Sequence, residues 1–219
     1  MRQVRRVLPA AIGAIAWGIT LCAGVVTALP CEAQTTEADR VADGNALLAS
    51  RQLAIPVEGV TPAALRDTFS ECRGGRRHEA IDIAAPRGAK VFAADDGRVV
   101  KLFTSVPGGL TIYQFDPQGR LAYYYAHLDR YADGLREGMT LKRCELIGYV
   151  GASGNASTGS PHLHFAVFRL GPEQQWWEGT PLNPYPALVG AASAASAAGG
   201  PTGSPLAQPP LHQGSNTCR

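Results

Sequence analysis

Residues 104–125 of this 219-residue chain read TSVPGGLTIYQFDPQGRLAYYY. Two runs rich in aromatic and apolar side chains, 110–115 and 121–128, lie on either side of the short sequence DPQG, and the second continues past the quoted stretch. Such side chains favour extended strands, whereas Asp, Pro and Gly favour tight turns. The segment therefore predicts a hairpin of two antiparallel strands joined at DPQG.

Short apolar runs separated by turns continue from about residue 55 to residue 186. The turn sequences DDG, PGG and REG each contain a glycine, which readily adopts the positive φ angles that tight turns require. The chain has 25 glycines and 16 prolines, and this block has no long helical periodicity. We therefore predict one mostly β domain over residues 55–186, an antiparallel sheet with strands at 90–94, 98–103, 110–115, 121–128, 146–150 and 162–169.

The first 33 residues have the features of an export signal. Arg2, Arg5 and Arg6 precede an almost uncharged apolar run from Val7 to Leu29. A basic start followed by an apolar stretch is typical of a secretory signal peptide, with cleavage after residue 33. Because about 20 apolar residues suffice to cross a bilayer, an uncleaved membrane anchor through residues 7–29 is the alternative. Either form would export the domain that follows.

Two further segments flank the predicted domain. Residues 34–54 are polar and compatible with a helix, so we expect a linker or a short helix there. Residues 187–219 consist mainly of Ala, Ser, Gly and Pro, which bury too little apolar surface to offset the loss of chain entropy on folding. We therefore predict a disordered tail over 187–219.

Charge and cysteine content limit the function and the compartment. The net charge is +2, and residues 1–33 account for all of it, so the remainder is balanced and nucleic-acid binding has no support from composition. Cys72, Cys144 and Cys218 would remain after cleavage. Export permits disulfides, but an odd number leaves at least one cysteine unpaired or paired elsewhere. Within the predicted domain, Cys72 and Cys144 either form a disulfide or are unpaired residues that pack in the domain, and the sequence leaves both alternatives open.

Two histidines stand in the stretch SPHLHFAVF, residues 160–168. Side chains alternate between the two faces of a strand, so His162 and His164 project to the same side, about 6–7 Å apart. One of them can then bind a metal while the other reaches the metal's open side. Two histidines on a half-exposed strand face, without a metal, are the alternative.

Two earlier segments contain further residues that suit a metal site. His78 lies four residues before Asp82, in a context that predicts a loop for the histidine and a strand for the aspartate. Histidine and carboxylate are both normal zinc ligands, and a catalytic zinc keeps three protein ligands and a water. His127 ends the run YYYAH, where alternation would place it on one face with Tyr123 and Tyr125. A surface ion pair for His78 and a structural role for His127 are the alternatives.

Together these motifs resemble the lysostaphin-type (LytM) zinc endopeptidases. The resemblance is carried by HEAID (78–82), YYYAHL (123–128) and GNASTGSPHLHF (154–165), in that order. This chain departs from the pattern at Ala80 and Cys144, where a glycine is common, and at Ala166, where an acidic residue is frequent. None of these departures removes a ligand. The resemblance implies the family's antiparallel β fold, with zinc in a groove.

The resemblance also implies the roles of five residues. His78, Asp82 and His164 would bind Zn²⁺, while His127 and His162 would act on the water and the substrate beside it. The family cleaves peptide cross-links in bacterial peptidoglycan, so the expected partners are peptidoglycan stem peptides. We therefore expect an exported zinc endopeptidase, a monomer in the periplasm or cell envelope, with no nucleic-acid partner. A non-catalytic module of the same family, which binds peptidoglycan or activates a separate hydrolase, is the alternative.

Overall fold

The structure is a computed structural model, and it describes residues 36–190. The predicted signal peptide or membrane anchor at 1–33 lies outside these residues, as does the predicted tail from residue 191 onward. Within the described part of the chain, no helix has both the length and the apolar character needed to cross a membrane.

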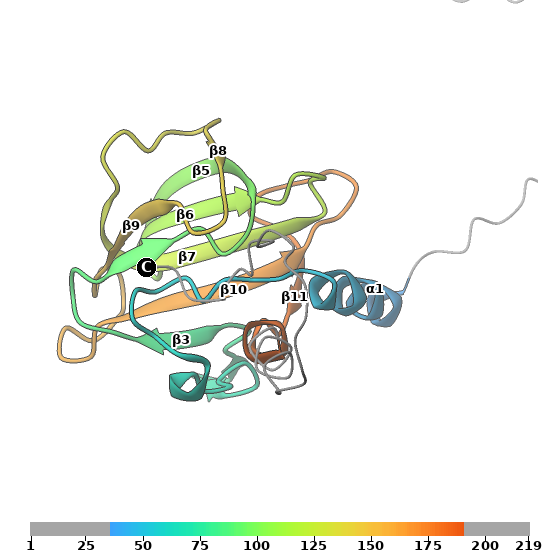
Figure 1. Cartoon of the computed structure of the whole chain (residues 1–219). Coiled ribbons are helices and arrows are strands. Elements are labelled where there is room, and N and C mark those ends of the chain that lie inside the picture. The colour runs from blue at the N-terminus through green and yellow to red at the C-terminus, as the bar shows by residue number, and fades with distance from the viewer. Residues whose placement is uncertain (1–35, 191–219) are drawn as a thin grey trace, which may run out of the picture. The chain divides into compact units, whose positions relative to one another are not determined.

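Antiparallel strands dominate the described residues, as predicted (Figure 1). The main sheet has the order β11-β10-β7-β6-β5-β8; in addition, β3 pairs with β10, and β9 pairs with β4 and β7. Strands β1 and β2 form a separate two-stranded sheet. The elements are α1 (Glu37–Ala49), a short 3-10 helix (Pro62–Ala64), β1 (Cys72–Arg73), β2 (Arg76–Arg77), β3 (Ile81–Ala84), β4 (Lys90–Phe92), β5 (Gly97–Ser105), β6 (Gly109–Phe115), β7 (Leu121–Tyr131), β8 (Thr140–Leu141), β9 (Leu146–Val150), β10 (His162–Arg169) and β11 (Thr180–Leu182).

The predicted hairpin at DPQG is formed by β6 and β7. Asp116, the first residue of the turn, is buried, and its Oδ1 accepts hydrogen bonds from the backbone N–H groups of Arg120 (2.6 Å) and Leu121 (2.8 Å). Gly119 supplies the positive φ, 65°, that the turn requires. Arg51 forms an ion pair with the same carboxylate. The turn is therefore fixed by a buried carboxylate, both of whose oxygens have hydrogen-bonding or ionic partners.

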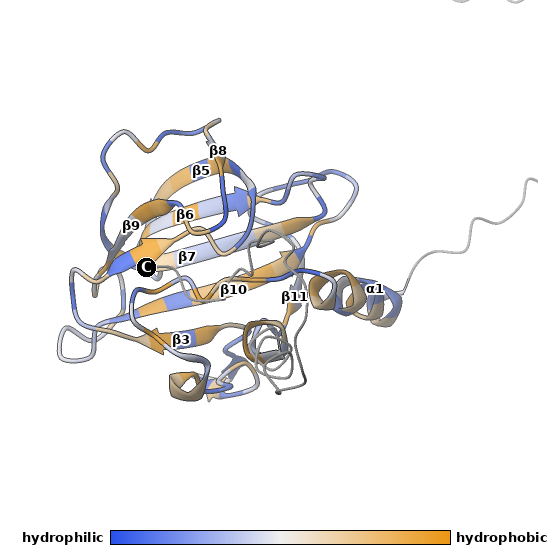
Figure 2. Ribbon diagram, in the orientation of Figure 1, coloured by the Kyte–Doolittle hydropathy of each residue, from blue (hydrophilic) through white to orange (hydrophobic). Residues whose placement is uncertain are grey.

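The core lies on one face of the central strands. Alternation along β7 buries Tyr123 and Tyr125, and alternation along β10 buries Leu163, Phe165 and Val167. The rings of Tyr125 and Phe165 pack with their centroids 5.3 Å apart. Figure 2 shows hydrophilic segments within β10 beside these apolar ones. One face of β10 thus packs in the core, and the other face carries the histidines.

The segment predicted as a linker or short helix contains the helix α1. Its N-terminus has a capping box: Thr36 Oγ1 accepts a hydrogen bond from the backbone N–H of Asp39 (3.1 Å), and the Asp39 carboxylate accepts one from the backbone N–H of Thr36 (3.0 Å). Gly44 lets the helix approach β11, because a Cβ there would lie 2.7 Å from a side-chain carbon of Leu182. The helix therefore packs on the sheet rather than linking two units.

The start of the predicted tail, at residue 187, is too early. Residues 185–190 are helical, and the side chain of Leu188 is fully buried in the main core. Residues 187–190 therefore belong to the folded domain. Composition alone does not reveal this, because it depends on the contacts of Leu188 with apolar side chains of the core.

The described cysteines do not pair with each other. Cys72 is free and exposed, so the Cys72–Cys144 disulfide that the sequence left open is not formed. Cys144 is itself disulfide-bonded.

The buried hydroxyl of Tyr125 joins a polar network inside the core. It donates to Gln114 Oε1 (2.8 Å) and accepts from the backbone N–H of Ala94 (2.9 Å), and Gln114 Nε2 donates to the backbone carbonyl of Asp95 (2.7 Å). Burial raises the pKa of Tyr125 above its ordinary value, so the hydroxyl stays neutral. Removing it would leave a buried donor and a buried acceptor without partners.

We therefore expect Tyr125→Phe to lower the free energy of unfolding by about 1–3 kcal/mol, the usual result of leaving buried polar groups unsatisfied. Urea unfolding followed by circular dichroism measures this loss. Tyr149→Phe is the matched control, because Tyr149 lies on β9, is only half-buried and packs its ring against Arg130. Equal stability of the two variants would contradict the network.

Candidate metal centre

Three potential metal ligands converge where β3 pairs with β10. His78 lies in the loop just before β3, Asp82 lies on β3, and His164 lies opposite Asp82 on β10. His78 Nε2 is 3.1 Å from His164 Nδ1 and 3.1 Å from Asp82 Oδ1, and the last two atoms are 3.2 Å apart. The loop-then-strand arrangement predicted for His78 and Asp82 is confirmed.

The triangle formed by these three atoms has the size that a zinc ion requires. Bonds of about 2.0–2.1 Å in tetrahedral geometry place neighbouring ligand atoms roughly 3.3 Å apart. Two imidazole nitrogens and one carboxylate oxygen also form a donor set typical of catalytic zinc. Among the residues that the structure describes, this is the one group of three or more such side chains close enough to hold a metal. The residues present therefore fit a zinc ion.

Thr68 orients two members of this set. Its backbone carbonyl accepts a hydrogen bond from His78 Nδ1 (3.1 Å), and its Oγ1 accepts one from the backbone N–H of Asp82 (3.1 Å). The bond to His78 leaves Nε2 as the nitrogen with a free lone pair, as metal binding requires. Sequence reasoning missed Thr68, since a threonine ten residues before a histidine has no recognisable spacing.

The guanidinium of Arg73, which sequence reasoning also missed, reaches into the same cluster. Its Nη1 donates to Asp82 Oδ2 (2.6 Å) and lies 3.0 Å from His78 Nε2, while Nη2 donates to Glu71 Oε2 (2.8 Å). Burial by itself would raise the pKa of Asp82, but the adjacent His164, His78 and Arg73 side chains hold that pKa far below its ordinary value. Asp82 is therefore a carboxylate.

The other two predicted site residues stand beside the triangle. The ring of His127 lies 5.5 Å from the ring of His164 and 5.0 Å from the ring of His162, between centroids. His127 Nδ1 is 2.8 Å from the backbone carbonyl of Ser153, and His162 Nδ1 is 2.9 Å from that of Ser160. A carbonyl only accepts hydrogen bonds, so both rings carry a proton on Nδ1 and present Nε2 to the site.

The face predicted for His127 was wrong. Alternation placed it with Tyr123 and Tyr125, yet these two rings are buried in the core while His127 meets the other histidines. The cause is a β-bulge in β7. Residues 110 and 112 of β6 pair with residues 128 and 125 of β7, so β7 has one extra residue there, and His127 has a φ of +61°. The bulge turns the imidazole to the face of Tyr124.

The loop 151–160 supports this bulge. Ser153 Oγ donates to the backbone carbonyl of Leu128 (2.7 Å) and accepts from the backbone N–H of Leu110 (3.0 Å), while the Ser153 carbonyl holds His127. Gly154 permits the contact, because a Cβ there would lie 2.3 Å from the backbone nitrogen of Gly109. Besides leading to β10, this loop therefore positions His127.

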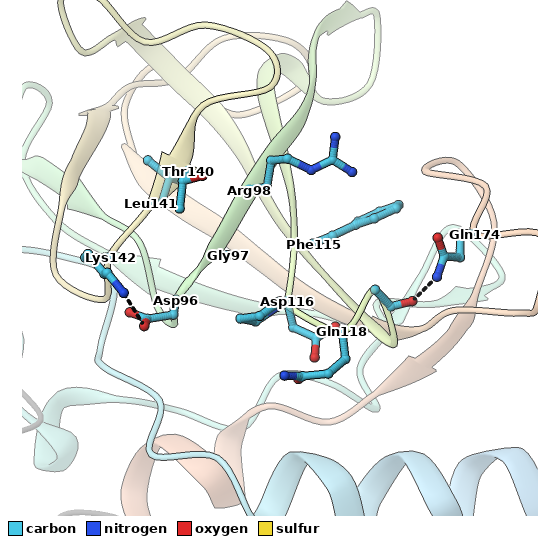
Figure 3. A pocket seen from close by; sticks show the side chains of 12 residues that line it. Asp96, Gly97, Arg98, Phe115, Asp116, Gln118, Thr140, Leu141, Lys142 and Gln174 are labelled. Carbon is cyan, nitrogen blue, oxygen red and sulfur yellow. Dashed lines mark hydrogen bonds and ion pairs between the residues drawn. The ribbon is translucent and has the colours of Figure 1, made fainter.

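A pocket of about 470 Å³ contains none of these five residues (Figure 3). It is lined by residues of the turns around β5, β6 and β8, among them Asp96 and Asp116. Each of these two acids has a cationic partner: Lys142 Nζ donates to Asp96 Oδ2 (3.1 Å), and Arg51 forms an ion pair with Asp116. Both acids are therefore used in ion pairs, and the metal centre is the better candidate for chemistry.

Comparison with known proteins identifies a family and several relatives. The model of peptidase family M23 matches residues 76–184. The L-Ala–D-Glu endopeptidase of Bacillus subtilis is 32% identical over 143 residues, which are 62% of this chain and 42% of that protein. A peptidoglycan DD-endopeptidase of Vibrio cholerae is 31% identical over 90 residues, 41% of this chain and 20% of that protein.

A solved structure agrees with the fold. The crystal structure of a protein from Ruminococcus gnavus named after the glycyl-glycine endopeptidase LytM superposes with a TM-score of 0.55 and 28% identity. The match covers 72% of this chain and 65% of that one. The chain spans less than half the length of the curated relatives that it matches.

The hydrogen bonds to backbone carbonyls predict the tautomers of three imidazoles. We expect His78, His127 and His162 to carry their neutral-state proton on Nδ1, because each Nδ1 faces a carbonyl oxygen. Long-range ¹H–¹⁵N correlation spectra of labelled protein above pH 7 distinguish the two nitrogens. A dominant Nε2–H form at His127 would show that the Ser153 carbonyl does not hold the ring.

Proposed function

Because residues 76–184 belong to peptidase family M23, we propose that this chain is a zinc-dependent endopeptidase that hydrolyses peptide cross-links of bacterial peptidoglycan. One observation carries the proposal: a ligand triangle of zinc size, His78–Asp82–His164, lies beside two imidazoles that present Nε2 to it. The names of the two endopeptidase relatives support a peptide bond as the target.

His78, Asp82 and His164 would hold the zinc. The ion would supply Lewis-acid activation of a water and of the scissile carbonyl. Asp82 contributes negative charge to this cationic centre, and the Thr68 carbonyl keeps the His78 lone pair directed at the metal. These residues therefore provide the binding half of the mechanism.

His127 and His162 would move the proton and stabilise charge. Burial lowers the pKa of His127 below its ordinary value, which keeps Nε2 unprotonated and suits it to accept a proton from the attacking water. His162 Nε2 lies 3.7 Å from Asp82 Oδ1, next to the ligand triangle, where a hydrogen bond to the developing oxyanion is within reach. The backbone carbonyls of Ser153 and Ser160 fix both rings for these roles.

The substrate requires that the domain be outside the cytoplasm. The basic start and apolar run of residues 1–33 support export, either as a cleaved signal peptide or as an anchor through residues 7–29. We propose that the domain works as a monomer in the periplasm or cell envelope. A non-catalytic module that binds peptidoglycan or activates a separate hydrolase explains the site less well, because such a module needs neither the three ligands nor both histidines.

Two substitutions on one face of β10 test the assigned roles. His164→Ala removes one of three ligands, so we expect both bound zinc and hydrolysis to be lost. His162→Ala removes a group outside the ligand set, so zinc should remain near one per chain while turnover falls by about 10²–10⁴. Metal analysis of the purified variants, combined with chromatography of digested cross-linked muropeptides, measures both quantities.

The same experiment gives the outcomes that exclude this function. Undiminished hydrolysis by chelator-treated protein would end the zinc mechanism. A zinc-free His162 variant beside a zinc-loaded His164 variant would reverse the two roles. Stoichiometric zinc without cleavage of any muropeptide would favour the binding module.

Arg73 offers a second test, because its guanidinium would compete with the proposed metal for the lone pair on His78 Nε2. His78 Nδ1 donates to Thr68, so Nε2 has a single lone pair, which accepts a hydrogen bond from Arg73 or binds zinc but cannot do both. We expect Arg73→Gln to bind zinc about tenfold or more tightly, since a charge-assisted bond no longer competes.

Zinc affinity is measured by competition with a chromophoric chelator. Arg76→Gln is the matched control, because Arg76 pairs with Arg73 across the β1–β2 hairpin and is exposed. Weaker zinc binding by the Arg73 variant would instead mean that the guanidinium supports Asp82 as a ligand.

A further inference from the structure

A row of aromatic rings leads away from the proposed zinc site. The ring of Tyr124 lies 5.9 Å from that of His164, and Tyr113 lies 4.6 Å from Tyr124. The row continues to Trp176, 4.9 Å from Tyr113, and then to Trp177, 5.2 Å from Trp176. Phe103 also packs on Trp176, at 5.3 Å. We call these five residues the aromatic stripe: Phe103, Tyr113, Tyr124, Trp176 and Trp177.

Strand register places the stripe on the same face as the metal ligands. Tyr124 of β7 is opposite Ala166 of β10 and Tyr113 of β6. Ala166 and His164 are two residues apart on β10, so their side chains share a face. Because β10, β7, β6 and β5 lie side by side, the stripe crosses the strands (Figure 1). A ligand lying along it would end at His164.

The far end of the stripe is exposed to solvent. Within residues 36–190, the large apolar side chains that remain exposed are Val106 (89%), Trp177 (62%) and Phe103 (40%). Two of them belong to the stripe, and the third lies in the turn between β5 and β6, the strands that carry Phe103 and Tyr113. Exposed apolar side chains that gather in one area are typical of a binding surface.

The backbone under the stripe limits what can bind there. Strand β6 is paired with β5 and β7, and β7 and β10 are likewise paired on both sides. Beneath Tyr113 and Tyr124, an extended peptide therefore finds no free strand edge to which it can add. Contacts must come from side chains, which here are flat rings that bear two phenol hydroxyls.

We propose that the aromatic stripe binds sugar rings of the peptidoglycan glycan strand, and so presents the attached stem peptide to the metal centre. The faces of a pyranose are apolar C–H surfaces with hydroxyls at the rim, which match aromatic rings with polar edges. The proposal rests on the proposed function for the choice of polymer. Binding of a glycan without peptides needs neither zinc nor a scissile bond, so it can succeed or fail independently of hydrolysis.

Fluorescence of the full-length protein can test this surface, because two of the chain's three tryptophans are Trp176 and Trp177. We expect peptide-free oligomers of β-1,4-linked N-acetylglucosamine, and glycan strands freed of stem peptides by an amidase, to change that fluorescence saturably. Trp177→Ala should weaken the affinity about three- to tenfold, the usual contribution of one stacked ring. Trp176 remains as the reporter in this variant. Tyr149→Ala removes an aromatic ring outside the stripe and should bind as the parent does.

Three outcomes would overturn the proposal. A saturable response to free stem peptide but not to glycan would assign the stripe to the peptide. Parental affinity of the Trp177 variant for glycan would remove the exposed ring from the binding surface. The absence of a saturable response to either ligand would mean that the stripe only packs the loop 171–179 against the sheet.

Discussion

The rest of the structure depends on the pairing of β10 between β3 and β7. On the β3 side of β10, His164 is opposite Asp82, and on the β7 side it is opposite Ala126. The alternate side chains of β10, Leu163 and Phe165, are fully buried. A slip of one residue would exchange the two faces and place imidazoles in the core, which the hydrophobic effect opposes. Core packing therefore fixes the register, and the register brings the metal ligands together.

His127 is the place where local geometry departs from this regular pattern. A non-glycine residue at positive φ costs of the order of 1–3 kcal/mol, so surrounding contacts must hold it. Its backbone N–H donates to the Gly108 carbonyl (2.8 Å), and its ring is held by Ser153. These two contacts come from loops far apart in sequence. Regular alternation would place the imidazole of His127 on the core face, whereas the bulge places it on the face of the site.

The centre contains a desolvated carboxylate, whose negative charge a neighbouring cation stabilises. Asp82 is a largely buried carboxylate that lies against His78 and His164, and the Arg73 guanidinium compensates its charge. Arg73 comes from the β1–β2 hairpin, which is separate from the main sheet. A zinc ion would bring a larger charge to the same atoms. The hairpin therefore supplies a cation to the candidate metal site.

The sequence by itself determined the mostly β architecture and the main strands, and its motifs predicted the five candidate site residues that the structure brings together. Period-two alternation and glycine turns are local properties of the sequence. The sequence alone therefore predicted that His78 lies in a loop before the strand of Asp82, and that His162 and His164 lie on one strand. Only the tertiary structure decided the face of His127, because a bulge depends on partners in neighbouring strands. It also decided the roles of Thr68 and Arg73 and the burial of Leu188, since each depends on a contact between residues that no short spacing links.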